Sequence, residues 1–267
     1  MQVSRVRVLA YTGLTLLLPS CASQVEVQRV YLPVVNYPPF GGHGVGTTYD
    51  DFEVAYNLGA DWVYNWGIPE DVPWGLYPAA MVWCTTIPKG LEGYPVILWG
   101  NEPDIASQCN KSPQEYADFW NENVGAYGDT YNVAPAVAHV EWLEEFLPLL
   151  SVAPDAISVH CYGHDGGPDC KGFITQFRTF GYPVIVSEWA WIGTDPQEAA
   201  DYIVDMMAWF DANRDWIIAD AYFQARYEGT EPWAFGPEYN TSLVDWERGD
   251  LTPQGRAFRS MAIVVTQ

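Results

Sequence analysis

Short runs of strand-forming residues alternate with helical stretches along most of this chain. The runs that we predict to be strands are 44–48, 62–66, 79–84, 96–101, 132–137, 157–162, 184–188 and 219–224. This alternation is typical of parallel strands, because each parallel pair needs a long crossover connection. Eight such units within residues 43–267 predict an α/β fold, a single (β/α)8 TIM barrel.

Two of the predicted helices begin with clear caps. Ser112 and Asp195 each precede a proline, and Glu115 and Glu198 follow at the third helical position. The other predicted helices are 51–58, 141–150, 172–180 and 254–264. An open, doubly wound sheet is the competing fold, but it typically has a phosphate-binding glycine loop after its first strand. The glycine pattern at 41–46 precedes that strand instead, and we interpret it as a turn.

The first 21 residues have the pattern of an export signal. Arg5 and Arg7 precede an apolar run over 8–18 that is too short to span a bilayer, and the segment ends at Cys21. Two outcomes stay open: Cys21 is lipidated and anchors the protein to a membrane, as in a bacterial lipobox, or an ordinary secretory cleavage occurs nearby. Both predict an extracellular or cell-surface protein. Residues 22–42, rich in proline and glycine, are predicted to be a tether.

The acidic balance of the chain limits its partners. Asp and Glu number 34 against 12 Lys and Arg, a formal charge of -22, which argues against binding nucleic acid or an anionic membrane surface. We expect a monomer that acts on a neutral substrate. Solubility alone also explains such a surface, so the charge identifies no function.

Export places the four remaining cysteines in an oxidising compartment, where pairing is expected. Three pairings are open. We favour Cys84 with Cys109, because they follow neighbouring predicted strands, and Cys161 with Cys170, because they bracket one loop. No Cys-x-x-Cys or His-x-x-x-His spacing accompanies them, so we expect neither a metal site nor a cofactor.

Two strand ends carry paired chemistry. The fourth predicted strand ends in Asn101-Glu102, and the seventh ends in Glu188-Trp189. Active sites of (β/α)8 barrels lie at the carboxyl ends of the strands. Hydrolysis of a glycosidic bond with retention of configuration needs two carboxyl groups roughly 5 Å apart, an acid/base and a nucleophile. Glu102 and Glu188 are therefore the candidate pair.

Four longer motifs sharpen this prediction. They are Trp-Gly-Asn-Glu-Pro-Asp at 99–104, Tyr-Asn-Trp-Gly at 64–67, Ser-Glu-Trp-Ala at 187–190 and Leu-Thr-Pro-Gln-Gly-Arg-Ala at 251–257. Together, over about residues 43–262, they resemble clan A of the glycoside hydrolases, most closely family 128. The resemblance implies an endo-β-1,3-glucanase that needs no cofactor and binds β-glucan, with Glu102 as acid/base and Glu188 as nucleophile.

The resemblance implies roles for further residues. Asn101 would bind the sugar 2-hydroxyl, and Tyr162 would hold Glu188 ionised; His160 lies on the same strand face as Tyr162. Tyr222-Phe223 falls where the family often has a Trp-bearing pair, and we expect these two residues and His160 to bind substrate. Aromatic rings suit the apolar faces of sugars, so we also expect Trp66 and Trp189 to bind substrate. Asp104 is expected to serve the loop rather than the reaction.

Two alternatives stay open. The first is hydrolysis of another β-linked polysaccharide, namely mannan, xylan or mixed-linkage glucan. The second is a surface carbohydrate-binding barrel without turnover, because one barrel fold supports many functions.

Overall fold

The computed structural model describes residues 40–167, 169–229, 236, 239 and 241–264. They belong to one compact unit, Asn36–Gln267. The predicted signal and Cys21 lie outside the described residues. The predicted tether overlaps the folded unit at its end, because β1 begins at Gly42 and the ring of Phe40 is buried against Trp62.

The strands form one parallel sheet that closes on itself, which confirms the predicted (β/α)8 barrel. The sheet order is β3-β2-β1-β9-β8-β7-β6-β5-β4. β3 and β4 flank Ala79: β3 pairs with β2, and β4 pairs with β5. β4 lies within the predicted strand 79–84, whereas β3 precedes it. The strands are β1 (Gly42–Gly46), β2 (Trp62–Tyr64), β3 (Tyr77–Pro78), β4 (Ala80–Met81), β5 (Val96–Leu98), β6 (Tyr131–Val137), β7 (Ala156–Gly163), β8 (Val184–Trp191) and β9 (Ile217–Tyr222).

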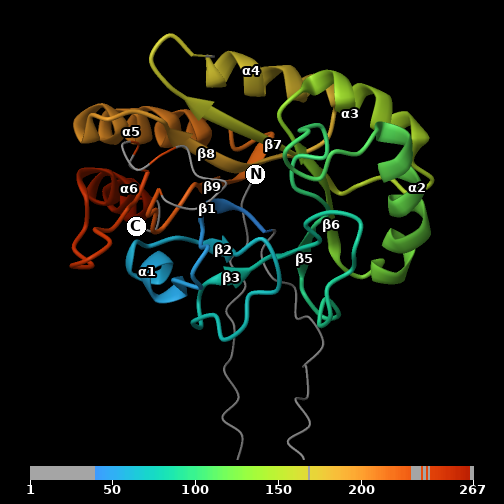
Figure 1. The fold of residues 1–267 in the computed structure, drawn as a ribbon, viewed down its shortest axis with the longest axis horizontal. Coiled ribbons are helices and arrows are strands. Elements are labelled where there is room, and N and C mark those ends of the chain that lie inside the picture. The colour runs from blue at the N-terminus through green and yellow to red at the C-terminus, as the bar shows by residue number, and fades with distance from the viewer. Residues whose placement is uncertain (1–39, 168, 230–235, 237–238, 240, 265–267) are drawn as a thin grey trace, which may run out of the picture. The chain divides into compact units, whose positions relative to one another are not determined.

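Helices surround the strands (Figure 1). They are α1 (Phe52–Asn57), α2 (Pro113–Asn123), α3 (Val140–Phe146), α4 (Cys170–Gln176), α5 (Pro196–Ala212) and α6 (Pro253–Val264). The predicted capping box forms between Ser112 and Glu115, and the Asp195 side chain accepts a hydrogen bond from the backbone of Gln197. Loops without a helix connect β2 to β3 and β4 to β5. Within the described part of the chain, no helix has the length and apolar character needed to cross a bilayer.

The glycine pattern at 41–46 is not a turn, as predicted, but supplies the first strand. A Cβ on Gly44 would lie 2.4 Å from the Trp62 ring, and one on Gly46 would lie 2.8 Å from the Trp66 ring. Glycine is therefore needed here because Trp62 of β2 and Trp66, two residues beyond its end, pack across β1.

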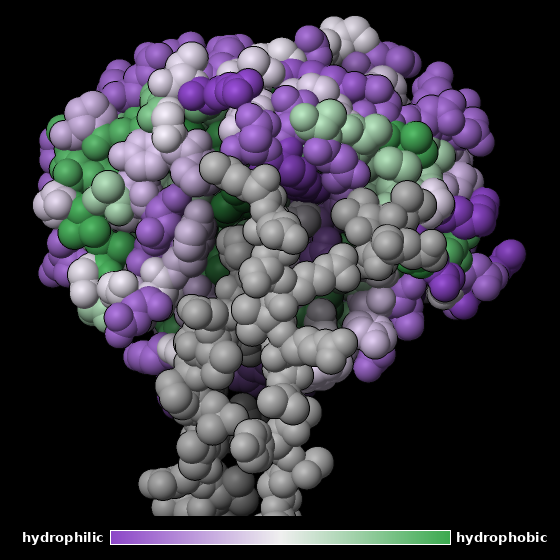
Figure 2. Space-filling model, turned by 180° about the vertical axis from the view of Figure 1, so that it is seen from behind, coloured by the Kyte–Doolittle hydropathy of each residue, from purple (hydrophilic) through white to green (hydrophobic). Residues whose placement is uncertain are grey.

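Apolar side chains fill two layers, inside the barrel and between the barrel and its helices. The inner layer includes Phe40, Trp62, Tyr64, Met81, Leu98, Val133 and Ile185. The outer layer includes Trp99, Trp120, Phe146, Phe177, Trp189, Phe210 and Phe258. Strand residues alternate between the two layers, because successive side chains point to opposite faces. On the face shown in Figure 2, hydrophilic residues predominate and hydrophobic ones form scattered patches.

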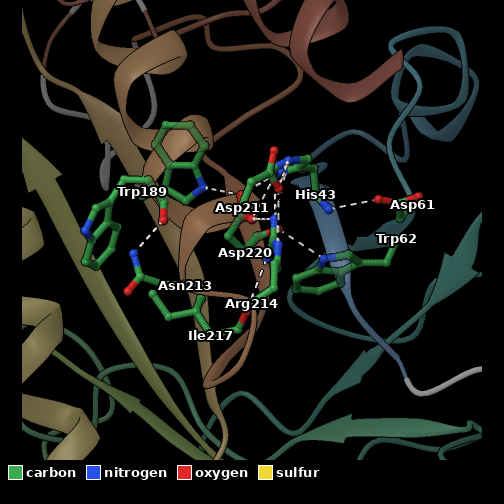
Figure 3. Close-up of polar contacts among 10 residues, drawn as sticks. His43, Asp61, Trp62, Trp189, Asp211, Asn213, Arg214, Ile217 and Asp220 are labelled. Carbon is green, nitrogen blue, oxygen red and sulfur yellow. Dashed lines mark hydrogen bonds and ion pairs between the residues drawn. The ribbon is translucent and has the colours of Figure 1, made fainter. Parts of the chain in front are cut away.

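A polar cluster interrupts the core where β1 and β9 pair. His43 lies opposite Asp220 in the register, and its Nδ1 is 2.9 Å from an Asp220 oxygen. Arg214 donates to the same carboxylate at 2.7 Å, and Asp211 lies 3.1 Å from His43 (Figure 3). Trp189 donates from Nε1 to Asp220 at 3.0 Å. The Asp220 carboxylate is completely buried, but it is paired with a permanent cation and with hydrogen-bond donors.

Candidate active site

Glu102 is held just beyond β5 by a strained backbone. Its N–H donates to the carbonyl of Ala136 at 2.9 Å, and its φ is 43°, in the left-handed region that few non-glycine residues adopt. Two residues earlier, Gly100 has a φ of 138°, and a Cβ there would meet the Tyr116 hydroxyl at 2.4 Å. Strain of this kind persists where surrounding contacts fix the backbone, and it is concentrated at functional sites.

Glu188 is buried within β8 and is surrounded by hydrogen-bond donors. Trp66 donates from Nε1 to Glu188 Oε1 at 2.7 Å, and the Tyr64 hydroxyl donates to the same oxygen at 3.3 Å. The Tyr162 hydroxyl donates to Oε2. A carboxylate accepts all three bonds best when it is ionised.

His160 joins the two glutamates. Its Nδ1 is 2.9 Å from Glu102 Oε1, and its Nε2 is 3.5 Å from Glu188 Oε1. One oxygen of each carboxylate and one ring nitrogen all lie within 4.8 Å of one another. The carboxylates are therefore close enough for attack and protonation at a single glycosidic bond, at the spacing of retaining rather than inverting enzymes.

The three groups titrate together. Burial raises the pKa of Glu102, but the hydrogen bond and charge of His160 outweigh this and lower it. Burial raises the pKa of Glu188, and the opposing charge of His160 and the donors Tyr162 and Trp66 only partly offset that rise. Burial lowers the pKa of His160, whereas the charges of both glutamates raise it more. Each proton therefore belongs to the cluster rather than to one residue.

The same three residues have the spacing needed to hold a metal ion. However, these ligand atoms already bond to one another and to Trp66 and Tyr162. A metal ion would have to displace those bonds. We assign the cluster to acid–base chemistry on the basis of these contacts.

A cavity of about 220 Å³ opens beside Glu102 and His160. Ala138, Cys161, Tyr162 and Phe173 complete its lining. The cavity therefore lies on the Glu102 side of the cluster, where a leaving sugar would be placed.

Asp104 shapes the loop beside this cavity, as expected for a loop residue. Its carboxylate accepts hydrogen bonds from the backbone N–H groups of Ala138 and His139 at 2.9 and 2.7 Å, and it pairs with the His139 ring at 2.8 Å. Asp104 thus fixes the start of α3 against the Glu102 loop.

Several predicted binding residues do lie at the cluster. Trp66 and Tyr162 contact Glu188 directly, and Phe223 packs its ring against both of them at 5.7 and 5.6 Å. Asn101 is buried, and its Oδ1 has no hydrogen-bond partner among the described residues. A buried acceptor without a partner costs free energy, which a ligand hydroxyl would recover.

Two predicted sugar-binding residues, Trp189 and Tyr222, point the wrong way. Trp189 is fully buried and packs against Phe210 of α5, and Tyr222 is fully buried against Trp189 and Phe258 of α6. Both side chains belong to the outer layer because Trp189 follows the inward-facing Glu188 and therefore faces the helices. Neither is placed to contact a sugar.

Some residues of the site were not predicted. Tyr64 belongs to a quoted motif and contacts Glu188, and two-residue alternation from the inward-facing Trp62 could have located it. Ser187 lies at hydrogen-bond distance from His160, and Ser158 lies at hydrogen-bond distance from Ser187. Small polar residues within buried strands give no sequence signal for such a contact.

Two disulfides are present, Cys84–Cys109 and Cys161–Cys170, with Cα atoms 5.4 and 5.7 Å apart. These are the pairs favoured above. The second brings the first residue of α4 to β7, so it fixes the helix that carries Phe173 beside the cavity.

A closed parallel barrel with two glutamates at its strand ends defines the class of glycoside hydrolase catalytic domains. Residues 42–258 match the family described as glycosyl hydrolase catalytic core, and the chain belongs to that family. It is therefore a glycoside hydrolase. No curated protein matches the chain.

Solved structures of family 128 share the fold. An endo-β-1,3-glucanase from Amycolatopsis mediterranei in complex with laminarihexaose aligns with TM-score 0.67 and 22% identity, over 83% of this chain and 99% of that one. An exo-β-1,3-glucanase from Cryptococcus neoformans aligns with TM-score 0.67 and 25% identity, over 83% and 99%. An oligosaccharide-binding protein from Cryptococcus neoformans aligns with TM-score 0.66 and 20% identity, over 83% and 93%.

Proposed function

We propose that this protein is a retaining, endo-acting β-1,3-glucanase in which Glu102 is the acid/base and Glu188 the nucleophile. The observation that carries the mechanism is the placement of these two carboxylates within 4.8 Å of each other, one after β5 and one in β8, with His160 between them. The endo action and the β-1,3 linkage rest on the family 128 motifs and on the glucanases that share the fold.

In the first step, a Glu188 oxygen attacks the anomeric carbon while Glu102 gives its proton to the leaving glycosidic oxygen. The bond from the anomeric carbon to that oxygen breaks, and a glycosyl ester forms on Glu188. The donors Tyr64, Trp66 and Tyr162 favour the ionised form of Glu188 that attacks. Asn101 offers its free Oδ1 to a sugar hydroxyl near the reacting carbon.

In the second step, Glu102 is a carboxylate and takes a proton from water as the water oxygen attacks the anomeric carbon. The ester bond to Glu188 breaks, and Glu188 returns as a carboxylate. The lowered pKa of Glu102 suits this step, because a general base must be ionised. Both attacks invert the anomeric carbon, so the configuration is retained.

We also propose that the protein works outside the cytoplasm. Its two disulfides favour an oxidising compartment, and a polysaccharide substrate is too large to be taken up intact. A monomer needs no partner to complete this site, because every residue named above comes from one chain.

The test is release of reducing sugars by the purified protein from laminarin, mixed-linkage glucan, xylan, mannan and cellulose. We expect cleavage of laminarin, with the β-anomer as the first product by NMR, and oligosaccharides of mixed length. Glu188→Ala and Glu102→Ala should lose this activity. Glu122→Gln, an exposed change in α2, is the matched control and should keep it.

Other outcomes identify the alternatives. Release of glucose alone would replace endo with exo action. Cleavage of mannan or xylan in place of laminarin would change the substrate class but keep the mechanism. Binding of laminarin without any product would reject turnover and favour a carbohydrate-binding barrel.

A further inference from the structure

A chain of two serines continues from His160 away from the glutamates. His160 Nε2 is 3.0 Å from Ser187 Oγ, Ser187 Oγ is 2.7 Å from Ser158 Oγ, and Ser158 Oγ is 3.2 Å from the carbonyl oxygen of Ile185. Both serines are only 1% exposed. Buried hydroxyls are costly unless they are bonded, so their hydrogens have defined positions.

The carbonyl of Ile185, the last partner in this series, fixes which atom donates in each hydrogen bond. A carbonyl only accepts, so Ser158 donates its single hydrogen to Ile185. Ser158 must then accept the hydrogen of Ser187, since no second hydrogen is available for that contact. Ser187 in turn has only a lone pair to offer His160. The hydrogen between them therefore belongs to His160 Nε2.

This assignment restricts the other ring nitrogen. The Nδ1 atom faces Oε1 of Glu102 at 2.9 Å. When Glu102 carries its acid proton on Oε2, Oε1 can only accept, and a bare Nδ1 would leave two acceptors facing each other. The acid form of Glu102 is then compatible only with hydrogens on both nitrogens of His160.

We infer that Ser158 and Ser187 are positioning residues that hold His160 as an imidazolium, and that this state directs the acid proton of Glu102 to Oε2, the oxygen left free to protonate the leaving sugar. The inference rests on the proposed function of Glu102. The two serines act through His160 and do not touch the substrate.

The charges around His160 agree with this state. Glu188, Glu102 and Asp104 all act on the ring and favour its charged form, and His139 acts on Glu102. The hydroxyls of Tyr64 and Tyr162 face Glu188 rather than the ring. An imidazolium needs an acceptor for each N–H, and the serine chain supplies the second one.

The first test reads the hydrogens directly in the free full-length protein. The chain has four histidines, so ¹⁵N shifts of their ring nitrogens can be resolved and assigned with a His160→Gln variant. We expect both ring nitrogens of His160 to be protonated at mildly acidic pH. A bare Nε2 that accepts from Ser187 would overturn the inference. This readout needs no turnover, so it is independent of the proposed function.

The second test separates acid catalysis from folding. Ser187→Ala removes the acceptor, and we expect kcat on laminarin to fall about 10-fold, the loss of one charge-assisted hydrogen bond. The rate on a 2,4-dinitrophenyl β-laminarioligoside, whose leaving group needs no proton, should change little. The alkaline limb of the laminarin profile should move to higher pH, because the charge of His160 lowers the pKa of Glu102 and is weakened in this variant.

Controls keep the second test decisive. Ser187→Thr retains the hydroxyl and should restore the laminarin rate, and the exposed Ser260→Ala should have no effect. Ser158→Ala should resemble Ser187→Ala, because the freed Ser187 hydrogen can turn toward Nε2. Equal losses on both substrates, with an unmoved alkaline limb, would mean that the serines are merely structural. An enzyme that cuts no glucan would instead reject the proposed function.

Discussion

Two buried histidines, His160 and His43, lie in the same barrel among carboxylates, but different cations balance the two clusters. Around His43, the permanent charge of Arg214 pairs with Asp220 at 2.7 Å. Around Glu102 and Glu188, the only cation that forms ion pairs among the described residues is the titratable ring of His160. An arginine cannot give up its proton, whereas an imidazole can. The first cluster is suited to holding strands together, and the second to moving protons.

The two clusters also differ in how fully their buried acceptors are hydrogen-bonded. Both oxygens of Asp220 accept hydrogen bonds, from Trp189, His43 and Arg214. Beside Glu102, by contrast, the buried Oδ1 of Asn101 has no partner in the part of the chain that the structure describes. Saturation stabilises a structural cluster, while an unfilled acceptor is available to a ligand.

The largest difference should appear when a carboxylate of the cluster around His160 is neutralised. We expect Glu188→Gln to lower kcat/KM on laminarin by about 10⁴-fold or more, because no nucleophile remains to form the ester. Thermal denaturation should show a folded protein. Reducing-sugar release and calorimetry measure the two effects. A variant with a tenth of the wild-type rate would refute the nucleophile assignment.

Neutralising a carboxylate of the cluster around His43 should lower stability instead. Asp220→Asn leaves Arg214 and His43 without their buried counter-charge, and we expect a loss of about 3–5 kcal/mol in the free energy of unfolding. Urea titration measures it. The matched control is Asp205→Asn, which breaks the exposed pair with Lys171 and should cost less than about 1 kcal/mol. Similar losses for both variants would contradict the role of Asp220.

A smaller effect should appear in the dependence of stability on pH. Burial lowers the pKa of His43, but the charge and hydrogen bond of Asp220 raise it by more. The pKa of His43 therefore lies above the ordinary 6.5. Its stabilisation is therefore complete below pH 6.5 and is lost as the pH rises through the folded pKa. His43→Gln should flatten the fall of the urea midpoint over this range. An unchanged slope would assign the pH dependence elsewhere.

The smallest effect should come from the loss of the hydrogen bond that Trp189, next to Glu188 in sequence, donates to Asp220. Trp189 follows Glu188 and donates to Asp220, so Trp189→Phe removes one buried hydrogen bond and should cost about 1 kcal/mol of stability. Because the side chain faces the helices, KM on laminarin should hardly change. A large rise in KM would return Trp189 to the sugar-binding set.

Local pattern was enough to predict the fold and the central pair. Strand composition and cap motifs located the eight units, and the ends of the fourth and seventh strands indicated Glu102 and Glu188. The orientation of Trp189 and Tyr222 was mispredicted because proximity to a strand end was given more weight than alternation. Register shifts beside His160 and after Val186 also break the simple two-residue count in β7 and β8.

The sequence by itself determined the barrel, the order of its elements and the carboxylates at its mouth, because these follow from short-range periodicity and from where strands end. Only the tertiary structure decided that His43 meets Arg214, 171 positions away, and that His160 reaches Glu102, 58 positions away. Such contacts depend on barrel closure and strand register, which bring residues that are distant in sequence side by side. The charge states of both histidines follow from those contacts, since burial and neighbouring charges exist only in the folded chain.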